Sequence, residues 1–163
     1  MKNSLLTKLC VGAALVLVSS QLANAQRTFP NRISGAYAGL QFTSFSSANG
    51  QQVPTLLSIT RGANNLRVVS IQLINGQNVT SQTVLRANGT ADTYTSVDGV
   101  IVQSGTGRYS RRGRTLNANF GVESSTSTFG LNQRITLRGN RVALLQNSPQ
   151  TGIVSYLLGN SAR

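Results

Sequence analysis

The chain has 163 residues, with 15 Lys+Arg against 3 Asp+Glu and no His, which gives a formal net charge of +12 at pH 7. Because His is the usual general base and the commonest metal ligand, this composition argues against most enzyme classes. The length suits one domain that buries its own apolar core.

The first 25 residues have the pattern of a secretory signal peptide. Lys2 and Lys8 flank a short polar start, an apolar run extends from Leu9 to Val18, and Ala23-Asn24-Ala25 forms a small-x-small cleavage site. The apolar run is about half the length that a bilayer-spanning helix needs, so no transmembrane helix is expected. The signal is of bacterial type and predicts export to the periplasm or the cell exterior.

Cleavage before Gln26 would change the chemistry of the chain. It removes the only cysteine, Cys10, and both lysines, which leaves 13 arginines against three acidic residues and a net charge of +10. An exported domain without a disulfide depends on its apolar core for stability. Residues 26–34 are expected to form a loose lead, residues 35–158 a single β-barrel domain and residues 159–163 a polar tail.

Turn signals recur along the domain at nearly even spacing. Asn-Gly and Asp-Gly pairs, which favour type I′ hairpins, occur at 49–50, 75–76, 88–89 and 98–99, and further turns are expected at 62–64, 112–113, 139–140 and 149–152. Apolar and polar residues alternate between these turns, as in 116–122 and 129–137, which is the period of a strand. Strands are predicted at about 35–46, 53–61, 66–74, 79–87, 91–97, 100–108, 114–122, 127–138, 141–147 and 152–158.

The links between these strands are too short for the crossovers that parallel strands need. The predicted fold is therefore all-β, an antiparallel up-and-down meander of eight to ten short strands. Even spacing favours a closed or nearly closed barrel over the alternative, a two-sheet β-sandwich. An outer-membrane barrel is disfavoured, because the chain has no Trp and its Phe and Tyr residues are scattered along the sequence.

No group of residues predicts catalysis. Asp92, Asp98 and Glu123 are the only acidic residues, and Asp92 and Asp98 would lie about 20 Å apart along a regular strand, too far for a glycosidase pair. The many Ser and Thr residues lack a basic partner once the lysines are removed. Three scattered acids without Cys or His do not form a usual zinc or calcium shell. We therefore expect no catalytic residue, no metal site and no cofactor.

The arginines carry the most specific signal. Guanidinium groups bind phosphate, sulfate and carboxylate through paired donors and stack on aromatic rings. Four arginines cluster around the turn at Gly113 beside a tyrosine, and three more follow near the next hairpin. The candidate anion-binding patch comprises Arg108, Tyr109, Arg111, Arg112, Arg114, Arg134, Arg138 and Arg141.

For an exported protein, the expected partner of this patch is an anionic polysaccharide, lipopolysaccharide or an anionic lipid surface. Nucleic acid is disfavoured, because single-strand binders interleave basic residues with several aromatic platforms and here only Tyr109 stands near the cluster. The alternative is that the charge only keeps the domain soluble and protects its sheet edges.

Two further interpretations stay open. The apolar rows of the strands should point into the barrel, which would hold either a filled core or one small apolar ligand. The candidate interior-facing residues are Phe120, Val122, Phe129, Leu131, Ile135 and Leu137. The abundance of Asn, Gln, Ser, Thr and Gly also suits a structural, self-assembling surface or matrix protein. The leading prediction is an exported, non-enzymatic β-barrel binding module.

Overall fold

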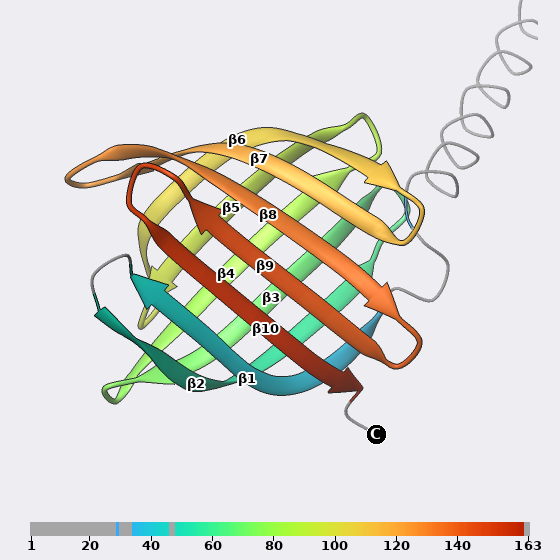
Figure 1. Ribbon diagram of the computed structural model, residues 1–163. Coiled ribbons are helices and arrows are strands. Elements are labelled where there is room, and N and C mark those ends of the chain that lie inside the picture. Colours follow the sequence, from blue (N-terminus) through green and yellow to red (C-terminus); the bar gives the residue numbers. More distant parts are fainter. Residues whose placement is uncertain (1–28, 30–33, 46–47, 162–163) are drawn as a thin grey trace, which may run out of the picture.

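The computed structural model describes residues 29, 34–45 and 48–161, and the predicted signal peptide, residues 1–25, lies outside this part of the chain. Ten antiparallel strands follow one another around a barrel (Figure 1). They are β1 (Gly35–Phe45), β2 (Ala48–Arg61), β3 (Asn65–Ile74), β4 (Gln77–Arg86), β5 (Thr90–Val97), β6 (Val100–Arg112), β7 (Thr115–Ser124), β8 (Thr128–Arg138), β9 (Arg141–Ser148) and β10 (Ile153–Ser161).

The barrel is closed by pairing between the first and last strands. β1 is hydrogen-bonded to β2 on one side and to β10 on the other, and each remaining strand pairs with its two neighbours in sequence. The prediction of an antiparallel up-and-down barrel is therefore confirmed, and the sandwich alternative is not adopted. Closure also removes the free sheet edges that an open meander would expose.

Local sequence explains most of the turns. Asn75 and Gly76 have φ of 52° and 80°, and Asp98 and Gly99 have φ of 48° and 85°, so both pairs place two central residues at positive φ as a type I′ turn requires. The turn predicted at 49–50 is wrong, because β2 already begins at Ala48, which lies opposite Phe45. Cross-strand pairing to β1 outweighs the local turn preference there.

Several strands are longer than predicted, and the extensions of β6 and β10 are clear examples. β6 continues to Arg112, where residues 100–108 were expected, and β10 continues to Ser161, where a tail was expected from residue 159. Both extensions pair with a neighbour: Arg112 lies opposite Thr115, and Ser161 lies opposite Tyr37. Hydrogen bonds between paired strands therefore extend β6 and β10 through polar residues, which the pattern of alternating hydrophobicity did not predict to be strand.

The alternating rows of side chains build an apolar core inside the barrel. Phe120, Val122, Ile135 and Leu137 are buried in it. Phe129 and Leu131, the other two candidate interior-facing residues, are partly buried and pack against it. The core also includes inward-facing residues of β1 to β5, β9 and β10, namely Tyr37, Leu57, Ile59, Leu66, Val68, Leu85, Ala91, Val142, Leu144 and Leu157.

Part of the interior is polar. The inward-facing side chains of β3 are apolar at Leu66 and Val68 and polar at Ser70. The inward-facing rows of β2, β4, β5, β9 and β10 likewise contain both apolar and polar residues. The buried polar side chains are Gln41, Thr55, Ser70, Thr83, Thr93, Gln133, Ser148 and Ser155. Some of them form hydrogen bonds to a neighbouring strand: Gln72 Nε2 on β3 donates to Thr55 Oγ1 on β2 at 3.0 Å. The interior is therefore divided between an apolar and a polar region.

One residue of the N-terminal lead belongs to the core. Phe29 is fully buried and stacks on Tyr109, with ring centroids 6.0 Å apart and an interplanar angle of 12°. Offset aromatic pairs at this separation add to the free energy gained from burial. The expectation of a loose lead therefore does not hold at Phe29.

Candidate functional site: the arginine end of the barrel

The up-and-down topology brings alternate turns to the same end of the barrel. The β2–β3, β4–β5, β6–β7 and β8–β9 turns share one end, and the other turns share the opposite end. All the arginines that the structure describes lie in or near the first set of turns, so we name it the arginine end. They are Arg61, Arg67, Arg86, Arg108, Arg111, Arg112, Arg114, Arg134, Arg138 and Arg141.

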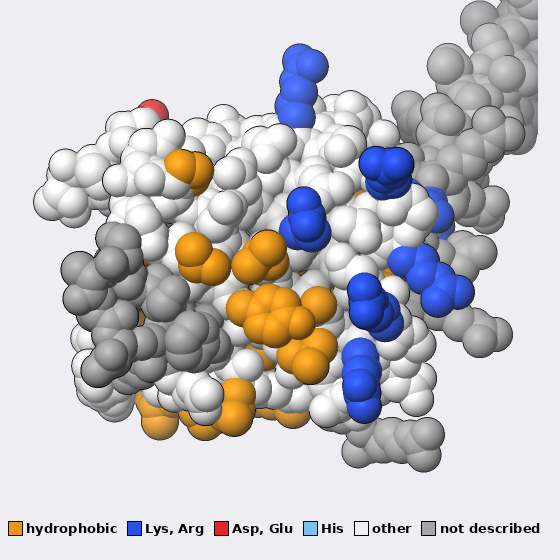
Figure 2. Space-filling view, viewed as in Figure 1, with side chains coloured by type: hydrophobic (Ala, Val, Ile, Leu, Met, Phe, Trp, Pro, Cys, Tyr) orange, Lys and Arg blue, Asp and Glu red, His pale blue; other side chains and the backbone are white. Residues whose placement is uncertain are grey.

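Acidic side chains do not balance this charge locally. Of the three acidic residues in the sequence, Asp98 lies in the β5–β6 turn and Glu123 near the end of β7, both at the opposite end. Only Asp92 lies towards the arginine end, where it forms an ion pair with Arg86 and raises the pKa of that guanidinium. The two ends of the barrel therefore differ strongly in charge (Figure 2).

Neutral groups hold several of the guanidinium groups in place. Arg67 Nη2 donates to Gln82 Oε1 at 2.6 Å, Arg134 Nε to Asn117 Oδ1 at 2.9 Å, and Arg111 Nε to the Gly113 carbonyl at 2.9 Å. Each guanidinium has five N–H donors in a planar arrangement, which suits paired hydrogen bonds to an anion. Side chains oriented in this way lose less conformational freedom when a ligand binds.

The structure brings the predicted patch together with one exception. Arg108, Arg111, Arg112, Arg114, Arg134, Arg138 and Arg141 are all exposed at the arginine end. Tyr109 instead packs against the core, its hydroxyl donates to the Arg86 carbonyl at 2.8 Å, and burial raises its pKa to about 12. Because alternate residues of β6 face opposite ways, Tyr109 points inward between two outward-facing neighbours and is not part of the patch.

Sequence reasoning missed Arg61, Arg67 and Arg86, which the fold adds to the same end. A usable signal was present in the sequence. Arg61 and Arg67 flank the turn at 62–64, and Arg86 precedes the turn at 88–89. Since every second turn of an up-and-down barrel lies at the same end, counting turns alone would have grouped these residues with Arg112 and Arg138.

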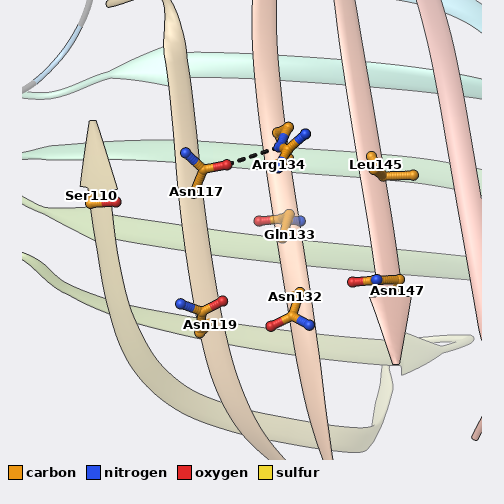
Figure 3. Close-up of a pocket in the computed structure, with 8 residues that line it drawn as sticks. All are labelled: Ser110, Asn117, Asn119, Asn132, Gln133, Arg134, Leu145 and Asn147. Atoms are coloured by element: carbon orange, nitrogen blue, oxygen red, sulfur yellow. Dashed lines mark hydrogen bonds between the residues drawn. The ribbon is translucent and has the colours of Figure 1, made fainter. Parts of the chain in front are cut away.

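A polar groove lies on the outer surface beside these arginines. Its volume is about 550 Å³, and it is lined by Ser110, Asn117, Asn119, Asn132, Gln133, Arg134, Leu145 and Asn147 from β6 to β9 (Figure 3). Asn119 lies opposite Asn132, which lies opposite Asn147, so three amide side chains form a row across adjacent strands. Amides both donate and accept hydrogen bonds, and the groove can therefore bind hydroxyl or oxyanion groups.

Comparisons with known proteins define the fold alone. No protein-family model matches the chain, and no curated protein sequence is significantly similar to it. Among solved structures, the crystal structure of Rv2717c from M. tuberculosis is similar, with a TM-score of 0.56 and 11% sequence identity over 88% of this chain and 98% of that chain. At this identity the similarity establishes a shared barrel architecture and no shared activity.

Among the described residues, no group of three or more His, Cys, Asp and Glu side chains gathers around a position for a metal ion. No helix in that part of the chain has the length and apolar character to cross a bilayer.

Proposed function

We propose that this protein is an exported, non-enzymatic binding module that docks through its arginine end on an anionic component of the cell envelope. The observation that carries the proposal is the placement of every described arginine at one end of the barrel, while Asp98 and Glu123 lie at the other. Six different strands contribute these arginines, so the patch is a property of the fold rather than of one basic segment.

The chemistry of the patch indicates the ligand class. Arginine forms paired, charge-assisted hydrogen bonds with phosphate, sulfate and carboxylate groups. Several guanidinium groups at one end also attract a polyanion over a distance of about 8–10 Å at moderate salt. We therefore expect a ligand with repeated anionic groups, bound with an affinity that falls steeply as ionic strength rises.

The arrangement of the interior supports surface docking over transport of a small apolar molecule. The apolar region is occupied by packed side chains, including the fully buried Phe29, Leu66 and Leu85. Other inward-facing positions carry hydroxyl and amide groups, and an apolar ligand would leave their hydrogen-bonding capacity unmet. Closure of the barrel likewise disfavours self-assembly through the edges of the sheet, since the ten strands are all paired on both sides.

Binding to inorganic polyphosphate, measured by fluorescence anisotropy over a range of NaCl concentrations, tests the proposal. The processed protein should bind, and its affinity should fall by more than tenfold between low and high salt. The Arg111→Gln/Arg112→Gln variant removes two exposed charges at the arginine end and should weaken binding at least tenfold.

The matched control is Gln77→Glu/Thr126→Glu, which lowers the net charge by the same two units at exposed positions of the opposite end. It should retain most of the affinity. Equal losses in the two variants would mean that net charge alone governs binding, and the proposed site would then be wrong.

A further inference from the structure

A second unusual surface borders the arginine end. Leu40 on β1, Leu56 on β2, Ile71 and Leu73 on β3, and Tyr156 and Leu158 on β10 point away from the core and are exposed. Leu56 and Leu73 expose 61% and 63% of their surface. We name these six residues the apolar outer face. Contiguous exposed apolar residues on a soluble domain mark contact with another protein or a membrane.

These residues are neighbours across four adjacent strands. Leu40 lies directly opposite Leu158 on one side and opposite Pro54 on the other, and Leu56 lies opposite Ile71. Directly opposed side chains have Cβ atoms about 5 Å apart, which is contact distance for leucine and isoleucine. The closure of β1 on β10 therefore makes one continuous patch out of segments from the two ends of the domain.

Arginines flank this face along the strands that form it. On β3 the outward-facing positions run from Leu73 through Ile71 and Val69 to Arg67. On the other flank, Arg141 lies opposite Asn160, the next outward-facing residue after Leu158 on β10. Figure 2 shows arginine side chains beside the hydrophobic patch on one face of the barrel.

We propose that the apolar outer face lies against an anionic lipid bilayer, with the flanking arginines at the level of the lipid phosphates. This inference rests on the docking function proposed above and names the lipid surface as its partner. Interfacial binding gains from buried apolar area and from attraction between basic side chains and anionic lipids, and both contributions come from one side of this barrel.

The opposite side of the barrel is polar and therefore unsuited to contact with lipid. Outward-facing residues of β7 and β8 include Asn117, Asn119, Asn132 and Arg134, which would be costly to place in hydrocarbon. Packed apolar side chains such as Leu66 and Leu85 fill one region of the barrel interior, whereas a transmembrane channel has a polar, water-filled lumen. The arrangement therefore fits a barrel that rests on the bilayer on one side only.

Charge favours lipid over a second copy of the chain. Glu123 lies on β7, away from the apolar outer face, and Asp92 is engaged by Arg86. Asp98 lies nearer to the face, because its Oδ1 accepts a hydrogen bond from the backbone N–H of Asn78 at 2.9 Å, and Asn78 is paired with Leu73. A second copy packed through the same face would therefore bring at most one of the three acidic side chains, Asp98, towards Arg67 and Arg141. Anionic headgroups supply a counter-charge at every point of the bilayer surface.

Vesicle sedimentation tests the inference with processed protein recovered after export, its N-terminus verified by mass spectrometry. The protein should bind vesicles that contain phosphatidylglycerol at least tenfold more tightly than pure phosphatidylcholine vesicles. The Leu56→Ser/Leu158→Ser variant should lose at least tenfold in vesicle binding and keep its affinity for polyphosphate. Its control is Val100→Ser/Ile101→Ser, which removes two exposed apolar residues outside the face and should bind vesicles as the wild type does.

Because the chain contains no Trp, a single introduced Trp reports its own surroundings. The fluorescence of Tyr156→Trp should shift to the blue on phosphatidylglycerol vesicles, and that of Tyr94→Trp on the far strand β5 should not. Binding to polyphosphate without binding to any vesicle would overturn this inference and leave the proposed function standing. Binding to neither would overturn both. A dimer that Leu56→Ser/Leu158→Ser converts to a monomer, with no vesicle binding, would assign the face to a second copy.

Discussion

Arg138 and Arg141 lie directly opposite each other in the first pair of the β8–β9 hairpin, and both are exposed. Like charges that face each other across two strands destabilise the pair by roughly 0.5 kcal/mol. The charge at the arginine end therefore has a cost in stability, which a bound anion would relieve.

Replacing Arg141 with Thr should separate stability from binding. The Arg141→Thr variant should raise the free energy of unfolding by about 0.5 kcal/mol, because it removes the like-charge contact and places a β-branched residue in a strand. Its affinity for polyphosphate should fall. Urea denaturation measures the first effect and anisotropy the second. Arg67→Thr serves as the control, since Arg67 bonds to Gln82, and it should lose affinity without gaining stability.

The buried Phe29 should be an anchor for the N-terminal lead. Phe29→Ala removes a fully buried ring that stacks on Tyr109, and it should lower the free energy of unfolding by about 3 kcal/mol. Phe29→Leu retains most of the apolar volume and should cost less than half as much. Urea unfolding of the processed protein measures both effects. Stability unchanged in Phe29→Ala would show that this ring does not contribute to the core.

Two glycines on facing strands provide a matched test of the packing of the barrel wall. A Cβ at Gly107 on β6 would lie 1.9 Å from the backbone oxygen of Asn119, whereas a Cβ at Gly121 on β7 would meet nothing within 4 Å. Gly107→Ala should therefore destabilise the fold by about 2 kcal/mol, because backbone atoms must move. Gly121→Ala should change stability by less than about 1 kcal/mol. Thermal or urea unfolding measures both effects. Equal losses of stability in the two variants would contradict this packing.

Tyr109 should make stability depend on alkaline pH. Burial raises its pKa to about 12 in the folded protein, above the ordinary value of 10.0, and burial also raises the pKa of Tyr37. Below pH 10 the hydroxyl is protonated in both states and the full stability is present. As pH rises from 10 towards 12 the unfolded chain ionises first, so stability falls.

Absorbance of tyrosinate at 295 nm, followed over this pH range, checks the assignment. One hydroxyl should titrate near pH 12 in the wild type, and this step should be missing in Tyr109→Phe. The same variant should show a smaller loss of stability between pH 10 and 12, while Tyr37 accounts for the remainder. If Tyr109→Phe instead lost a hydroxyl that titrates near pH 10 and kept the step near pH 12, the buried position of this hydroxyl would be contradicted.

The secondary structure and the inward rows of side chains could be predicted from the sequence because their signals are local. The alternation of apolar and polar residues in 116–122 and 129–137 indicates strands, because successive side chains of a strand point to opposite faces. Pairs such as Asn75-Gly76 indicate turns whose central residues have positive φ. The apolar outer face also has a local signal in the sequence, which the sequence analysis did not use. Leu56-Leu57, Val68-Val69 and Leu157-Leu158 are apolar on both faces of their strands, the pattern of strands that contact apolar surroundings on two sides.

The sequence by itself determined the all-β class, the positions of most turns and the excess of arginine, since each depends on residues close together in the chain. Only the tertiary structure decided that ten strands close through β1 and β10, where Gln41 and Ser155 hydrogen-bond across 114 positions of sequence. Closure also set which surfaces are continuous, because it places β10 beside β1 and gathers arginines from six strands at one end. Such long-range pairing depends on the fit of the whole barrel, which no local pattern of residues specifies.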